Sequence, residues 1–205
     1  MKRTALAILL GFAATGALAQ EGKPASPSAA PAAAALSVPV ADPAMTGLRI
    51  AWNRVKDITV RAAEKMPEEN YGFQATPEVK TFAQLTAHVA DTNYLIGGMI
   101  LGETPPAADI EKTKTSKAEI VAALKDSVAY LDKGFTLSDA DAAKLVKLFG
   151  KDAPKFSVVA LAIGHGFEHY GNMVTYMRMK GLVPPSSEPR PAAPAPAAGT
   201  NTEKK

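Results

Sequence analysis

Residues 157–180 read SVVALAIGHGFEHYGNMVTYMRMK, and this stretch decides the fold class. Along it, the side chains of one face recur every three or four residues, which is the period of an amphipathic α-helix. That face consists of Val158, Leu161, His165, His169, Asn172 and Tyr176. Gly181 follows directly, and glycine is common just past a helix end. We therefore expect a long helix from about Ser157 to Lys180, with this face directed inward.

Three earlier segments have the same period and predict helices over about residues 46–65, 81–102 and 116–134. Thr81 or Thr76 opens the second of them. Its inward stripe is Phe82, Leu85, His88, Thr92, Leu95 and Met99. Ser116 and Glu119 form a capping box, in which each side chain satisfies a backbone amide at the helix start. The capping box places the start of the third helix.

Before the last long helix, Ser138 predicts a short helix that runs through Asp141 and on to Leu148. No comparable run alternates with period two, so no strand is expected. Four long amphipathic helices with short or moderate connections are typical of a helix bundle. The sequence therefore predicts an all-α fold, a four-helix bundle with an extra short helix before the last long one.

Composition sets the boundaries of the domain and excludes several kinds of site. The chain has 205 residues and no cysteine, which rules out disulfides, thiolate metal sites and a cysteine nucleophile. Residues 20–43 and 184–205 are rich in Ala and Pro, a composition that predicts a flexible linker and tail. The bundle is expected over residues 44–183. With 23 basic and 20 acidic residues, the charge is too balanced to predict nucleic-acid binding.

The first 19 residues have the pattern of a secretory signal peptide. Lys2 and Arg3 precede an apolar run, and the small residues Ala17 and Ala19 suit a cleavage site. The alternative is a membrane anchor, but the run is shorter than the ~20 residues that span a bilayer. We expect an exported protein, periplasmic or secreted, without stable membrane insertion.

The three histidines of the chain, His88, His165 and His169, all fall on the inward stripes. His165 and His169 are four residues apart, so their rings project from one helix face. Three imidazoles from two helices can hold one divalent ion and leave other positions open. The alternative is a set of core histidines that only form hydrogen bonds, where each unpartnered nitrogen costs ~1–3 kcal/mol. The residues alone leave both interpretations open.

The surrounding motifs resemble a known family. HGFEHYGNM at 165–173, with YMR at 176–178 and GLVP at 181–184, resembles the closing-helix signature of the DinB/YfiT-like superfamily. FAQLTAHVAD at 82–91 is similar to the upstream element that supplies a histidine from the second helix. The resemblance covers about residues 48–184. It implies a four-helix bundle that binds a divalent metal, commonly nickel or zinc, through His88, His165 and His169.

The resemblance also implies an activity class and an assembly. Some members of the superfamily are transferases or isomerases that use low-molecular-weight thiols, and members often dimerise, so a homodimer is expected to be accessible to this chain. Imidazole ligands alone do not select the metal, because they suit zinc, copper, iron and nickel alike. Zinc or nickel is the expected ion.

Three polar residues next to the histidines are candidates for a supporting catalytic role. Asp91 and Glu168 can orient an imidazole or serve as general base, and Asn172 can donate to a ligand of the metal. The alternatives are solvated carboxylates for the first two and a packing hydrogen bond for Asn172. Glycines at 164, 166 and 171 indicate either a close helix approach or open space beside the histidines.

Two functions from different classes fit these observations. One is a metal-dependent hydrolase or thiol transferase that acts on a small molecule of unknown identity, although export weakens the thiol version. The other is a non-catalytic module that binds a metal or a partner. A bundle without metal, whose histidines only form hydrogen bonds, is the third alternative.

Overall fold

The computed structural model describes residues 40–189. The predicted signal peptide and most of the predicted linker and tail lie outside these residues. Four long helices dominate the described chain: α1 (Pro43–Lys65), α2 (Phe82–Leu101), α4 (Lys117–Asp132) and α6 (Lys155–Met179). The prediction of an all-α bundle is therefore confirmed, and none of the described helices is both long and apolar enough to cross a membrane.

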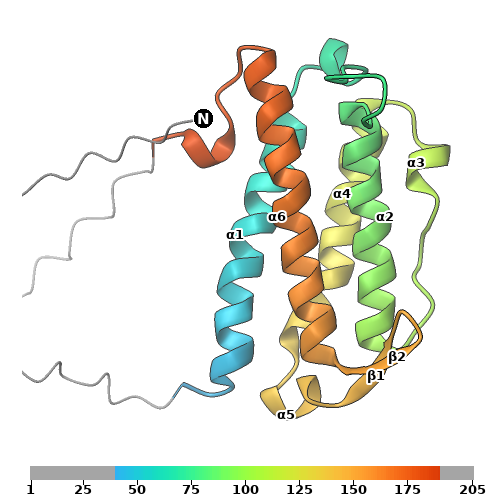
Figure 1. Cartoon of the computed structure of the whole chain (residues 1–205), viewed down its shortest axis with the longest axis vertical. Coiled ribbons are helices and arrows are strands. Elements are labelled where there is room, and N and C mark those ends of the chain that lie inside the picture. Colours follow the sequence, from blue (N-terminus) through green and yellow to red (C-terminus); the bar gives the residue numbers. More distant parts are fainter. Residues whose placement is uncertain (1–39, 190–205) are drawn as a thin grey trace, which may run out of the picture. The chain divides into compact units, whose positions relative to one another are not determined.

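The order of the helices around the bundle differs from their order along the chain. α6 packs between α1 and α2, and α4 packs on the other side between the same two helices. In Figure 1, α1 and α6 run in one direction, while α2 and α4 run in the other. Because α2 and α4 are parallel, the connection at 102–116 returns along the length of α2. It contains the short helix α3 (Ile110–Thr113).

The helix ends follow the local signals in the sequence. Thr81, rather than Thr76, caps α2 by accepting a hydrogen bond from the Gln84 amide, and Gln84 completes a capping box. Gly102 ends α2 in a left-handed conformation with φ of 75°. The predicted box of Ser116 and Glu119 opens α4. Such caps satisfy backbone groups that a helix end would otherwise leave without partners.

The prediction of one short helix reaching Leu148 is wrong. The helix α5 (Asp139–Ala142) is capped by Ser138, but residues 145–148 form the strand β1 (Leu145–Leu148). β1 pairs antiparallel with β2 (Lys151–Pro154). Phe149 and Gly150 make the turn with φ of 49° and 80°, the positive values that a tight two-residue hairpin turn demands. Phenylalanine is not a usual residue for such a turn, so the sequence offered only Gly150 as a signal.

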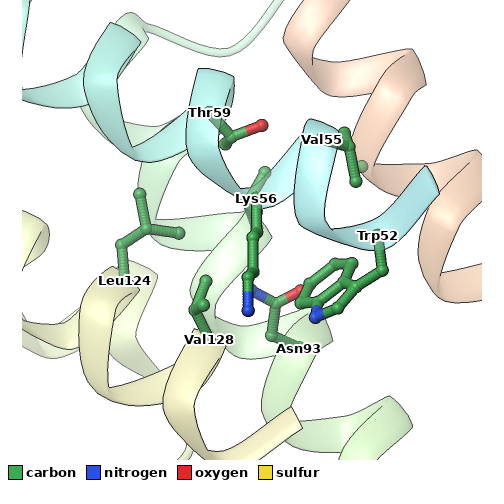
Figure 2. A pocket seen from close by; sticks show the side chains of 9 residues that line it. Trp52, Val55, Lys56, Thr59, Asn93, Leu124 and Val128 are labelled. Carbon is green, nitrogen blue, oxygen red and sulfur yellow. The ribbon is translucent and has the colours of Figure 1, made fainter. Parts of the chain in front are cut away.

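Apolar side chains fill the bundle, and α1 is tied to α4 by polar contacts. The Trp52 ring stacks on Phe135 at 4.8 Å between centroids, and its indole N–H donates to Asp132 at 2.6 Å. Deeper in this seam is a cavity of about 10 Å³, lined by Thr59 and Asn93 among others (Figure 2). The Thr59 hydroxyl, in a residue 3 % exposed, has no hydrogen-bond partner in the described chain.

The folded chain extends past the predicted boundary at residue 183. After α6, the 3₁₀-helix η3 (Pro185–Ser187) packs back on the bundle, with Pro185 buried. The Ser186 amide donates to the Tyr170 hydroxyl at 2.8 Å, and Glu188 forms ion pairs with Arg61 and Lys65 of α1. Six residues that composition assigned to the tail are thus part of the folded unit.

Candidate metal centre

The three histidines converge between α2 and α6. The Nε2 atom of His165 lies 3.3 Å from that of His88 and 2.9 Å from that of His169. Each of the three residues offers a ring nitrogen, and these nitrogens all lie within 4.8 Å of one another. The predicted ligand set is therefore one spatial cluster, with all three side chains partly buried.

These spacings match those of nitrogens that share an ion. Ligand nitrogens at about 2.0–2.1 Å from zinc lie about 3.0 Å apart for a right angle at the ion and about 3.4 Å apart for a tetrahedral one. The two Nε2 separations at His165 agree with this range. The group can hold one divalent ion.

Hydrogen bonding alone accounts poorly for the same geometry. A neutral imidazole nitrogen has either one lone pair or one proton. The Nε2 atom of His165 faces two other nitrogens at once, so one hydrogen bond leaves the second contact without a partner. A cation at the centre uses all three lone pairs together.

Local sequence explains how the helices bring these rings together. The four-residue spacing of His165 and His169 places both on the side of α6 that faces α2. Gly166 faces the bundle core, where an added Cβ would approach the Val55 side chain at 3.1 Å. Gly164 and Gly171 have open space around them. The close helix approach predicted for these glycines is thus found at Gly166, whereas Gly164 and Gly171 are exposed to solvent.

The environment keeps two of the rings in the neutral form. Burial, and then the neighbouring His169 and His88, lower the pKa of His165 to about 4. The pKa of His169 is also lowered, by burial and then by His88, while the Glu168 carboxylate opposes the change. Metal ligation requires the neutral imidazole. Both rings are thus in the ligand form at neutral pH.

Asn172 is exposed and not inward as predicted, yet it reaches the cluster. Its side-chain amide lies 3.4 Å from Nδ1 of His169, the nitrogen that does not face the other rings. The amide oxygen and nitrogen exchange places by a simple rotation. With the oxygen toward the ring, Asn172 accepts the Nδ1 proton and leaves the Nε2 lone pair directed at the centre.

The two candidate carboxylates occupy different positions. Asp91 accepts hydrogen bonds from the amides of Ile110 and Glu111 at 2.7 and 3.0 Å, and so holds the start of α3 against the middle of α2. Glu168 is exposed on α6, directly before His169. Its charge acts on that ring. Asp91 thus has a structural role, and Glu168 is the carboxylate that faces solvent beside the site.

Two features near the centre were not anticipated. The Lys80 charge acts on His169, and its ammonium group binds both carboxylate oxygens of Glu111 at 2.6 and 2.8 Å. Sequence spacing gives no signal for this pair, because the residues are 31 positions apart. Leu95, predicted to point inward, is 52 % exposed. The stripe of α2 to which Leu95 belongs continues from the histidines toward the hairpin, where the described elements cover it only in part.

The family model for the DinB superfamily matches residues 51–173. The chain belongs to the DinB superfamily. This result confirms the resemblance that the histidine motifs suggested. Among the curated proteins, nothing matches this DinB chain.

Solved structures share the fold of this DinB protein. A DinB-like protein from Bacillus cereus ATCC 10987 is 18 % identical with a TM-score of 0.62, and covers 68 % of this chain and 95 % of its own. A DinB-like protein from Bacillus subtilis is 20 % identical with a TM-score of 0.54, and covers 67 % and 93 %. A mutant of a mycothiol-dependent maleylpyruvate isomerase is 14 % identical with a TM-score of 0.54, and covers 63 % and 60 %.

Proposed function

We propose that this DinB protein is an exported enzyme that depends on one divalent metal ion and acts on a small molecule. His88, His165 and His169 hold the ion, which is zinc or nickel. The convergence of their three Nε2 atoms is the observation that carries the proposal. Hydrolysis is the preferred reaction, and transfer of a thiol is the second.

The chemistry of the donor set supports a catalytic ion. A divalent ion with three neutral nitrogen ligands retains its full charge, so it polarises a substrate oxygen and lowers the pKa of a water or thiol. The histidine side chains are partly buried rather than enclosed in the core of the bundle. Three protein ligands with open positions are the usual arrangement in catalytic zinc sites, whereas structural sites are closed by four.

The chain's own residues supply orientation and proton transfer. Asn172 holds the His169 ring by its Nδ1 atom and so fixes which nitrogen faces the centre. Glu168, exposed next to His169, is the carboxylate placed to take a proton at its side-chain oxygen. Lys80 pairs with Glu111 near the start of α2, on the same flank as Asn172, and its charge acts on the His169 ring. These groups make the flank toward the start of α2 polar.

Two observations bear on the choice between hydrolysis and thiol transfer. The similarity in fold to a mycothiol-dependent isomerase favours a thiol reaction. The predicted signal peptide favours hydrolysis, because thiol cofactors of the cytoplasm are less available outside it. Water is available in either compartment, so we place hydrolysis first.

The test starts with elemental analysis of the untagged protein. About one zinc or nickel per chain is expected, and metal-free protein whose melting temperature does not respond to either ion would overturn the proposal. A panel of esters, amides and thiol acceptors then tests turnover. His169→Ala is expected to lose it, while Asn53→Ala, an exposed polar residue of α1, is the matched control. Metal without turnover of any substrate would indicate the non-catalytic module instead.

A further inference from the structure

An open recess of about 590 Å³ lies beyond the histidines, toward the hairpin. The second half of α2, the loop at 102–105 and β1 form its walls, with Leu95, Met99, Pro105 and Val146 among the lining residues. Ligand sites in proteins have volumes of about 300–1,000 Å³ and mostly apolar walls. The polar side chains of Glu103, Thr104 and Lys147 complete the lining, so the recess has the size of a ligand site and offers both an apolar and a polar part.

A second recess lies next to the first one, nearer to the metal centre, and the carboxylates of Asp91 and Asp109 are in its lining. Its volume is about 280 Å³, and it shares Leu95 and Pro105 with the larger recess. It reaches Asp91, which follows His88 by three residues on α2. We name the two recesses together the furrow. The furrow extends beside α2 from the hairpin to within one helical turn of His88.

The side chains between the histidines and the hairpin are mainly apolar on both helices, apart from Thr92, which follows His88 by one turn on α2. Leu95 follows His88 by two helical turns on the same stripe of α2, and Met99 follows one turn later. On α6, the half-buried Leu161 precedes His165 by one turn. Because α2 and α6 run in opposite directions, both sets lie on the hairpin side of the centre (Figure 1).

The opposite flank of the centre has a different character. Lys80 and Asn172 lie there, and both act directly on His169. The centre therefore separates a polar flank from an apolar one. A single exposed leucine needs no explanation, but Leu95 lines both recesses and is aligned with the ligand His88.

We propose that the furrow binds the apolar part of the substrate, an unbranched alkyl or acyl chain of medium length, while the polar reacting group lies at the histidines. This inference rests on the proposed function, since it assigns a substrate class to the same centre. The rise of an α-helix places Leu95 about 10 Å and Met99 about 16 Å along the axis from His88. These distances set the length of chain that the furrow holds, and β1 closes its far end.

The test uses three probes on the untagged full chain. Octanol has a chain without a strong metal-binding group, acetohydroxamate has the metal-binding group without a chain, and octanohydroxamate has both. Binding is followed by the methyl NMR signals of Leu95, Met99 and Val146, with and without added zinc. Leu95→Gln is the test variant. Ile50→Gln is its matched control, because Ile50 is 69 % exposed on α1, away from the furrow.

We expect octanol to shift these methyl signals in the presence and absence of zinc. With zinc, octanohydroxamate is expected to bind at least tenfold more tightly than acetohydroxamate, since each buried methylene adds about two- to fourfold in affinity. Leu95→Gln should remove most of this gain, and Ile50→Gln should keep it.

Equal affinity of the two hydroxamates, or octanol shifts confined to other parts of the protein, would overturn the furrow proposal while the metal centre stands. A protein that takes up no zinc, yet still shifts the furrow signals with octanol, would overturn the proposed function instead. The two failures are thus distinguishable by the response of the same three methyl signals.

Discussion

The α1–α4 and α2–α6 seams of the bundle differ in whether their titratable side chains have hydrogen-bond partners. Between α1 and α4, Asp132 accepts from the Trp52 indole and from Lys56 at 2.6–2.8 Å, so its charge is matched in place. Between α2 and α6, the histidine nitrogens face one another, and no single hydrogen-bond pattern satisfies them all. Polar groups that satisfy each other maintain a fold, whereas histidine nitrogens that converge without doing so form a group that could hold a metal ion.

The largest expected effect lies in the α1–α4 seam and should leave the α2–α6 seam unchanged. Trp52→Ala removes a buried ring and its stack on Phe135, and truncations of this kind cost about 3–5 kcal/mol. Chemical denaturation measures the loss. The folded variant should still bind one metal ion per chain. Loss of metal binding in folded Trp52→Ala would contradict the independence of the two seams.

The next effect belongs to the α2–α6 seam alone. Zinc at one hundred times its Kd should stabilise the native protein by about 2.7 kcal/mol, because it binds the folded state only. His165→Ala should abolish this gain in thermal unfolding, since it removes the ligand at the middle of the cluster. A zinc-induced rise in melting temperature that persists in this variant would show that the ion binds elsewhere.

Replacing Asn172 tests whether its contact with His169 supports zinc binding in the α2–α6 seam. Asn172→Ala should weaken zinc binding by about 10- to 100-fold, the usual cost of losing a partner that orients a histidine ligand. Titration calorimetry measures the change. Asn172→Asp restores an acceptor for the His169 Nδ1 proton and should recover most of the affinity. Unchanged zinc affinity in both variants would show that Asn172 does not orient His169.

The pH dependence of the metal-free protein follows from the lowered pKa of His165. The unfolded chain takes up the proton near the ordinary histidine value of about 6.5, whereas the folded chain takes it up only near 4. Protons therefore favour the unfolded state between these values, and stability falls as pH falls from about 6.5 to about 4. Thermal unfolding of His165→Gln should show a shallower fall. Identical curves would contradict the buried, neutral ring.

The smallest effect is expected at the hairpin, outside both seams. Phe149 is 77 % exposed and has a positive φ, a conformation that asparagine adopts more readily. Phe149→Asn should raise the free energy of unfolding by up to about 1 kcal/mol, part of the ~1–2 kcal/mol that the left-handed conformation costs most residues, without a change in metal affinity. Denaturation and zinc titration of the same sample measure both. A lower stability would show that the exposed ring contributes contacts of its own.

Sequence reasoning was accurate where a signal is local. The caps at Thr81, Ser116 and Ser138 depend on residues three positions away, and each is present in the structure. It was wrong at residues 145–148, where a strand formed because the chain folds back on itself through Phe149 and Gly150. It was also wrong for Leu95, because period alone does not show how far a neighbouring element covers a stripe.

The residues of the candidate site also fall into those that local sequence predicts and those that it does not. The spacing of His165 and His169 follows from helix geometry alone, and the family resemblance pointed to His88. The contact of Asn172 with His169 has a local origin as well, since the two are three residues apart. The different roles of Asp91 and Glu168 were not predictable. The amides that donate hydrogen bonds to Asp91 come from α3, a segment with no clear helical pattern.

Four amphipathic helices, their caps and the two histidines on one helical face follow from local sequence patterns. These properties depend on interactions within a few residues, where the geometry of the backbone is known in advance. The packing of the folded chain was needed to make α2 and α6 neighbours, to bring His88 within 3.3 Å of His165, and to leave the surface toward the hairpin open. Those outcomes depend on how whole helices pack, and packing is the sum of many contacts between residues far apart in the chain.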